Sequence, residues 1–310
     1  MSDPTEKLGT IKCLEFRSSL ILQLQLWSYI CIYLILRRRL MKLSNILSRR
    51  NRILLRELVV TEFKLRYQGS VLGYLWSLLK PLMLFVILYV VFVKFFKLGT
   101  QIEHYPVYLL LGIVMWTFFT EATMQGMSAI VARGDLIRKI NFPKYIIVVS
   151  GTISALINLL LNLVIVFIFL LVNGVKIQWS ILLLPFNIIE LYVFSLAIAF
   201  LLSSMYVKYR DITHIWEVVL QGAFYATPIL YPVSMVVTAS PLLAKILMLS
   251  PVAQVIQDAR YNAVTHQAIT TSSLISNHLI AAIPYMLVLV SIIWASWYFK
   301  KSQKYFAENV

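Results

Sequence analysis

Charged residues are scarce in this chain of 310 residues. Only 13% of the residues are Asp, Glu, Lys or Arg, whereas 60% are hydrophobic and the mean hydropathy is +0.81. Soluble domains average about 25% charged residues, so a chain this apolar has too little polar surface to remain in water. The lipid bilayer is therefore its predicted solvent.

Residues that carry chemistry are also few. Cys13 and Cys31 are the only cysteines, which excludes a disulfide framework or a zinc cluster, and the four histidines have no metal-ligand spacing. None of the ten glycines belongs to a G-x-x-x-x-G-K-[ST] motif, so any ATP and Mg²⁺ must be bound by another subunit. No nucleophile elbow occurs either. Nothing argues for an active site, a metal or a cofactor in this chain.

Long apolar runs dominate the sequence after residue 70. Backbone groups in lipid must bond within the chain, which leaves helices or a closed barrel, and a barrel would show short alternating segments. A helical span needs about 20 apolar residues. The sequence predicts an all-α integral membrane protein with six transmembrane helices. The predicted spans are residues 71–96, 106–131, 145–172, 181–207, 212–237 and 279–299.

Basic residues gather in alternate loops. Nineteen Lys and Arg lie in segments 37–66, 133–144, 208–210 and 300–304, whereas the other side holds only five. Those five are Lys94, Lys97, Lys176, Lys245 and Arg260. Cytoplasmic loops carry such an excess, so both termini of the six-span domain are predicted in the cytoplasm. Orientation accounts for the net charge of +15, and no nucleic-acid partner is predicted.

Two Ser-Pro pairs, Ser240-Pro241 and Ser250-Pro251, lie between the last two spans. Serine at an N-cap followed by proline at the first helical position is a signal for the start of a helix. The pairs predict short helices over residues 241–249 and 251–261. Because neither is long enough to cross, both should lie at the external face or dip into it as re-entrant helices.

The first forty residues do not fit the same pattern. Residues 18–36 are apolar and precede three arginines, so they form either an extra hydrophobic segment or an upstream extension that is not native. We expect Met41 to be the start. The chain then divides into an upstream extension (1–40), a cytoplasmic interfacial region (41–70), a transmembrane domain (71–299) and a cytoplasmic tail (300–310).

Residues 52–66 have the character of an amphipathic helix. Leu54, Leu58 and Leu65 share one stripe, and most of the charged residues lie opposite. Val60 and Phe63, however, fall on the charged side. Such a helix lies in the membrane interface and serves either as an anchor or as a gate that binds an anionic lipid head group, because Arg and Lys suit phosphate.

Aromatic residues line one face of the first predicted span. Phe85, Tyr89, Phe92 and Phe96 recur at spacings of four, three and four, and Tyr74 extends the same side. A stripe of this kind is usually core packing or lipid contact. The alternative is a pathway lining on which sugar rings stack.

Two carboxylates, Glu121 and Glu190, lie at predicted membrane depth. Such residues are costly there and usually face the interior of the bundle. They serve either in hydrogen bonds between helices or in the transport pathway.

The loop from Arg133 to Lys144 mixes charged with apolar residues, and Phe142-Pro143 ends any helix within it. It is either a plain connector or a segment that docks into the groove of a partner protein.

Four segments in this order resemble the ABC-2 type transport permeases that export polysaccharides, such as O-antigen and teichoic-acid exporters. The run LRYQGSVLGYLWSLLKP (65–81) is similar to the signature of that family, and LIRKINFP (136–143) is similar to its coupling helix. Tyr209-Arg210-Asp211 resembles its second cytoplasmic loop, and the paired Ser-Pro helices resemble its external re-entrant helices. The resemblance covers residues 41–310.

The resemblance implies a homodimer bound to two copies of an ATPase subunit, with a glycan on undecaprenyl diphosphate as substrate. The residues implied to meet the diphosphate are Arg52, Arg56, Lys64, Arg66 and Lys80. Those implied to guide the glycan are Tyr74, Trp76, Phe85, Tyr89, Phe92 and Phe96. Those implied to couple to the ATPase are Arg133, Asp135, Arg138, Lys139, Phe142 and Pro143.

Three rival functions stay open at this point. A large external insertion would favour some drug or small-lipid exporters on the same framework, and none is present. A membrane-embedded transferase acting on lipid-linked sugars would need clustered catalytic residues, whereas the acidic residues are dispersed. A secondary transporter would need paired broken helices, but only the span that carries Pro228 and Pro232 is interrupted.

Overall fold

The computed structural model describes residues 49–67, 72–73, 75–97 and 102–306, apart from the side chains of Phe63, Arg66 and Tyr67. The chain divides into Met1–Asn51 and Arg52–Val310, and the features below belong to the second unit, apart from the first three residues of the first described helix. The expectations about residues 1–40, the start at Met41 and the side of Tyr74 fall outside the described residues.

The described part of the chain is almost wholly helical and holds no strand. Its elements are α2 (Arg49–Tyr67), α3 (Leu75–Leu88), the π-helix η2 (Tyr89–Phe95), α4 (Tyr105–Ala132), α5 (Gly134–Lys139), α6 (Tyr145–Val172), the 3-10 helix η3 (Trp179–Leu183), α7 (Leu184–Tyr206), α8 (Ile212–Ala226), α9 (Val233–Ala239), α10 (Pro241–Met248), α11 (Pro251–Ala263), α12 (Thr271–Leu274), α13 (His278–Ala281), α14 (Ile283–Ser302) and the 3-10 helix η4 (Gln303–Tyr305).

Among the described residues, five helical segments are long and apolar enough to cross a membrane. They are Leu75–Phe95, Tyr105–Ala132, Tyr145–Val172, Trp179–Tyr206 and Ile283–Tyr305. They confirm the predicted all-α membrane fold, and their bounds lie within a few residues of five predicted spans.

The remaining predicted span, residues 212–237, is not one continuous helix. It is α8, a non-helical stretch and then α9, because Pro228 and Pro232 have no backbone N–H to continue a helix. The 15 residues of α8 rise only about 22 Å, short of the roughly 30 Å hydrocarbon core. The predicted bounds of this span are therefore wrong at its C-terminal end, since α8 ends at Ala226.

Both Ser-Pro pairs begin a helix as predicted, α10 and α11, and these two helices meet at a bend of 95°. The Ser240 side chain caps α10 by accepting from the N–H of Leu243, whereas the Ser250 side chain makes no cap bond. Almost all of α11 is buried. This polar helix is therefore part of the core, and its predicted re-entry into the membrane stays a prediction.

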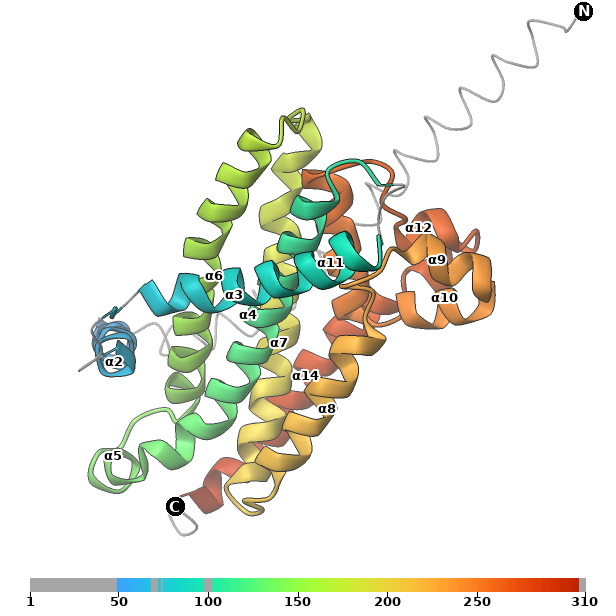
Figure 1. Ribbon diagram of the computed structural model, residues 1–310. Coiled ribbons are helices and arrows are strands. Elements are labelled where there is room, and N and C mark those ends of the chain that lie inside the picture. Colours follow the sequence, from blue (N-terminus) through green and yellow to red (C-terminus); the bar gives the residue numbers. More distant parts are fainter. Residues whose placement is uncertain (1–48, 68–71, 74, 98–101, 307–310) are drawn as a thin grey trace, which may run out of the picture. The chain divides into compact units, whose positions relative to one another are not determined.

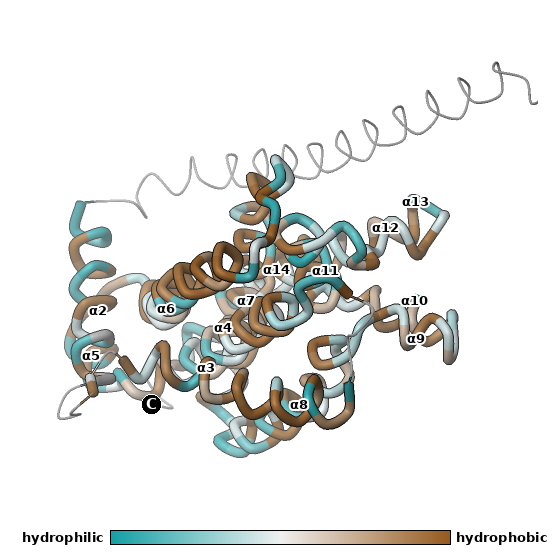
Figure 2. Tube along the Cα trace, turned by 45° about the horizontal axis from the view of Figure 1, so that its top comes forward, coloured by the Kyte–Doolittle hydropathy of each residue, from teal (hydrophilic) through white to brown (hydrophobic). Residues whose placement is uncertain are grey.

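The helices α4, α6, α7 and α14 run side by side, and α8 lies along the same bundle (Figure 1). α4 is the central element, since nearly every residue from Tyr105 to Phe119 is buried. One apolar cluster joins α4 to α3, α6 and α11, and a second joins the C-terminal ends of α4 and α14 and the N-terminal end of α6 to α2. α6 is hydrophobic over most of its length (Figure 2), as expected of a helix that also faces lipid.

Candidate functional site

The amphipathic helix α2 packs through one stripe of leucines. Leu58 is buried, and Leu54 and Leu55 contact the second apolar cluster. Leu65, which the sequence places on the same stripe, is exposed instead. The helix therefore packs along its first half.

The basic residues predicted to meet a diphosphate lie on two elements. Arg52, Arg56 and Lys64 are exposed on α2, and Lys80 is exposed on α3. No ion pair ties these four side chains among the described residues. The backbone of Arg66 lies in α2, but its side chain is outside the description.

Arg133, predicted to couple to an ATPase, lies at the junction of α4 and α5 and is already paired. Its guanidinium donates to the Glu62 carboxylate of α2 at 3.1 Å and to the Ser150 hydroxyl of α6 at 2.8 Å. Both side chains of the ion pair are about four-fifths buried, at 19% and 20% exposure. Arg133 thus joins α2, α5 and α6.

The short helix α5 presents its charges outward. Asp135, Arg138 and Lys139 are exposed, whereas Ile137 is buried against the second cluster. Asp135 lies in the first turn and the two basic residues in the last, which complements the helix dipole. Phe142 is half-buried and packs on the same cluster, next to the half-buried Pro143.

The loop between α7 and α8 carries the other segment that resembles a cytoplasmic loop. Lys208 stands over the Tyr209 ring at 4.9 Å, and a hydrogen bond with Tyr209 raises the pKa of Lys208.

The aromatic face of the first span is divided between core and surface. Phe85 is buried, with its ring 5.8 Å from Phe169 of α6 and 5.7 Å from Tyr89. Tyr89 and Phe92 are half-buried against the same core, whereas Phe96 is exposed. Trp76, on α3, is also exposed at its surface. From Tyr89 the helix has π geometry, which turns the later side chains away from the α-helical register that the spacing assumed.

A proline and an asparagine connect α3 to α6. Pro81 has no N–H, so it cannot donate to the carbonyl of Ser77 four residues earlier. The Asn162 side chain of α6 donates to that carbonyl at 3.1 Å and to the Asn158 carbonyl at 2.8 Å. Asn158 in turn donates to Glu121 of α4 at 3.0 Å. Three helices are thus joined by polar side chains that hydropathy did not single out.

The two intramembrane carboxylates have different surroundings. Glu121 is half-buried and bonded to Asn158. Glu190 is buried, and the Gln254 side chain of α11 lies beside its carboxylate. Asp258, which lies near Glu190, accepts from Gln254 at 2.6 Å and from Tyr285 at 3.0 Å.

The sequence did not predict the burial of Arg260. The residue falls within the helix predicted over residues 251–261, and in the structure it is fully buried in α11. The signal was available: Gln254, Gln257 and Asp258 interrupt the same short apolar helix, which is typical of a helix that faces a polar interior.

This fold defines a multi-pass helical membrane protein. Residues 53–264 match the ABC-2 type transporter family. The chain is 31% identical over 264 residues to the O-antigen export system permease protein RfbA of Myxococcus xanthus, covering 83% of this chain and 95% of that relative. Two proteins of Klebsiella pneumoniae with the same name are 28% and 29% identical over 197 residues, which is 60% of this chain and 74% of each relative.

The chain belongs to the ABC-2 type transporter family. It is a multi-pass protein of the bacterial cytoplasmic membrane and a transport subunit, not an enzyme. An ATPase partner supplies ATP hydrolysis.

Proposed function

We propose that this chain is the permease of an exporter that moves a lipid-linked polysaccharide of the O-antigen type across the cytoplasmic membrane. The observation that carries the proposal is the match to a relative named as an O-antigen export permease, which extends over 95% of that relative. The working complex is a homodimer of this chain bound to two ATPase subunits.

Coupling to the ATPase runs through α5. The exposed Asp135, Arg138 and Lys139 form a charged surface for docking, and the buried Ile137 holds the helix against the bundle. Since Arg133 at the start of α5 is bonded to Glu62, a push on α5 also moves α2. Phe142 and Pro143 fix the exit of the chain into α6.

The substrate head group meets the exposed basic side of α2. Arg52, Arg56 and Lys64 are accessible there, and guanidinium and ammonium groups bind phosphate oxygens strongly. Arg66 and Lys80 extend the same role toward the first span. Of the aromatic residues, Trp76 and Phe96 remain accessible for stacking on sugar rings, and Tyr74, Tyr89 and Phe92 complete the path. Phe85 supports the path from the core.

Deletion of the gene and complementation test the proposal. Wild-type permease should restore surface polysaccharide, and its loss should leave lipid-linked glycan at the inner face. Arg56→Ala should reduce surface polysaccharide without loss of the permease–ATPase complex. The matched control, Lys245→Ala, removes an exposed cation of α10 on the opposite side and should have no effect. Normal surface glycan in the deletion strain would refute the function.

Arg138→Ala tests the coupling role separately. In the purified complex it should leave substrate-independent ATP hydrolysis in place and abolish its stimulation by the lipid-linked glycan. Wild-type stimulation in this variant would show that α5 does not couple through its charged end.

A further inference from the structure

The C-terminal end of α8 continues as irregular backbone. Residues 227–232, called the break below, follow α8 without forming a helix. Residues 227–230 are buried, and buried backbone polar groups are hydrogen-bonded in folded proteins. The carbonyl groups around this break therefore need donors from elsewhere.

Tyrosine hydroxyls supply part of these donors. Tyr231 donates to the carbonyls of Tyr225 and Ala226, at 3.1 and 2.9 Å. Tyr105 of α4 donates to the carbonyl of Leu230.

A single buried guanidinium supplies most of the rest. Arg260 of α11 donates from Nη1 to the carbonyl of Pro228 at 2.6 Å and from Nη2 to the carbonyl of Ile229 at 2.8 Å. Gln257, one turn earlier, also donates to Pro228 at 3.2 Å. The break is thus tied to α11 by side chains.

The same guanidinium also binds α4. Its Nε donates to the carbonyl of Tyr108 at 2.9 Å, and its carbon lies 3.7 Å from the centre of the Tyr108 ring. The guanidinium packs against α4 at Gly112. A Cβ at that position would stand 2.1 Å from Nη2, so the contact requires glycine there. Among the described residues Arg260 forms no ion pair, so backbone carbonyls and a ring face stabilise its charge.

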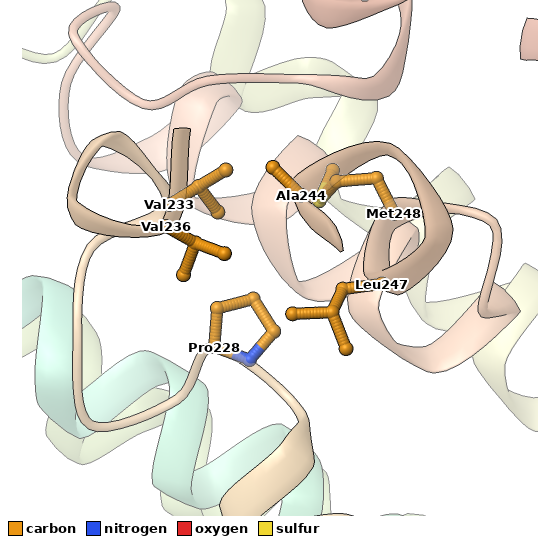
Figure 3. Close-up of a pocket in the computed structure, with 6 residues that line it drawn as sticks. All are labelled: Pro228, Val233, Val236, Ala244, Leu247 and Met248. Atoms are coloured by element: carbon orange, nitrogen blue, oxygen red, sulfur yellow. The ribbon is translucent and has the colours of Figure 1, made fainter. Parts of the chain in front are cut away.

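On its other side the break contacts α9 and α10. Pro228 lines a small apolar pocket with Val233 and Val236 of α9 and with Leu247 of α10, completed by Ala244 and Met248. Figure 3 shows the proline ring directed into this pocket. Pro228, whose carbonyl accepts a hydrogen bond from Arg260, therefore also packs against α9 and α10.

We propose that Arg260 is a positioning residue for transport, which holds the outer end of α8 against α4 and α11 in this conformation and releases it when the outer side of the pathway opens. Carbonyls held by side chains exchange their donors for water without unwinding a helix. The break is therefore the place where α8 separates from the bundle most easily. This inference rests on the transport function, but not on which glycan is exported.

Two substitutions disturb the contact between Arg260 and α4, one on each of the two helices. Arg260→Gln removes the guanidinium, and Gly112→Ala keeps Arg260 but fills the space that its Nη2 occupies. Gly222→Ala is the matched control, because a Cβ at this α8 glycine meets nothing within 4 Å. Each is made in the full-length chain and purified with its ATPase. We expect the first two to reduce export by about tenfold while ATP hydrolysis continues, and the control to match wild type.

A labelling experiment separates positioning from folding. Leu230→Cys, in a chain without the two native cysteines, is buried at the break and should resist a membrane-impermeant maleimide added from outside. Labelling should appear in the assembled complex once Arg260→Gln or Gly112→Ala is added, and not with Gly222→Ala.

Protection of Leu230→Cys with normal export in both variants would overturn the proposal. Failure of both variants to assemble would overturn it too, because Arg260 would then serve folding alone. If Arg260→Gln fails to assemble but Gly112→Ala assembles, export and maleimide labelling of the Gly112→Ala variant test the proposal. Because labelling needs no substrate, a wrong assignment of the glycan would leave this result intact.

Discussion

Asn162 is expected to compensate for Pro81, and the two can be tested together. Asn162→Ala removes the donor that reaches the buried Ser77 carbonyl, at 3.1 Å in the wild-type chain. Hydrogen bonds between membrane helices average about 0.6 kcal/mol, and an orphaned buried polar group costs roughly 1–3 kcal/mol. We expect a loss of about 1–2 kcal/mol, which corresponds to a decrease of roughly 2–8 °C in the thermal midpoint.

Pro81→Ala should relieve that loss. The substituted residue has an N–H four positions after Ser77, which can donate to the same carbonyl within α3. Thermal unfolding of the purified complex, measured for both single variants and the double variant, gives the coupling between the two sites. Asn173→Ala is the control, because the Asn173 side chain, at the C-cap of α6, donates to the Phe169 carbonyl of that helix and to no other helix in the described part of the chain. If Asn162→Ala costs as much in the Pro81→Ala variant as in the wild-type chain, the compensation is refuted.

Three further predictions concern other contacts of the bundle, and all are measured by the thermal midpoint of the purified complex. Glu62→Arg and Arg133→Glu should each destabilise the folded permease by about 1 kcal/mol, and the double variant should regain the stability of the wild-type chain. A double variant less stable than both single variants would exclude the ion pair. Glu190→Gln should be neutral or stabilising, because burial of a carboxylate close to a second acidic group, Asp258, is costly. Asp258→Asn should cost about 1.5–3 kcal/mol, because Asp258 accepts two hydrogen bonds. A larger loss for Glu190→Gln than for Asp258→Asn would contradict this. Gly126→Ala should cost about 1–3 kcal/mol by overpacking, since its Cβ would lie 2.5 Å from a side chain of α7; an unchanged midpoint would show that the two helices can separate freely.

Hydropathy and loop charge predicted the parts of this fold that depend on local sequence. The span over residues 145–172 coincides with α6, and α10 and α11 begin at Pro241 and Pro251 as predicted. These features follow from the length of apolar runs and from capping residues, which act over a few positions.

Contacts between distant residues could not be predicted in the same way. Asn162 and Ser77 are 85 positions apart, and their meeting depends on how α3 and α6 rotate and pack, which periodicity does not specify. The burial of Arg260 could not be predicted for a related reason. Its cation is bonded by backbone carbonyls of Tyr108, Pro228 and Ile229, which only tertiary packing brings to it.

The candidate site likewise contains residues whose positions local sequence predicts and residues whose contacts depend on tertiary packing. The exposed positions of Arg52, Arg56 and Lys64 agree with their place on an amphipathic helix, because amphipathicity is a local property. Phe85 illustrates the opposite case, since its contact with Phe169 of α6 could not be read from the spacing of aromatic residues in one span.

ATP-driven movement of a lipid-linked polysaccharide in reconstituted vesicles tests the central claim most directly. The permease–ATPase complex would be inserted into proteoliposomes that contain lipid-linked glycan extracted from the host membranes. With ATP and Mg²⁺, glycan should cross from the face that bears the ATPase to the opposite face, and a non-hydrolysable ATP analogue should stop it. Active ATP hydrolysis without any movement of the glycan would contradict the account.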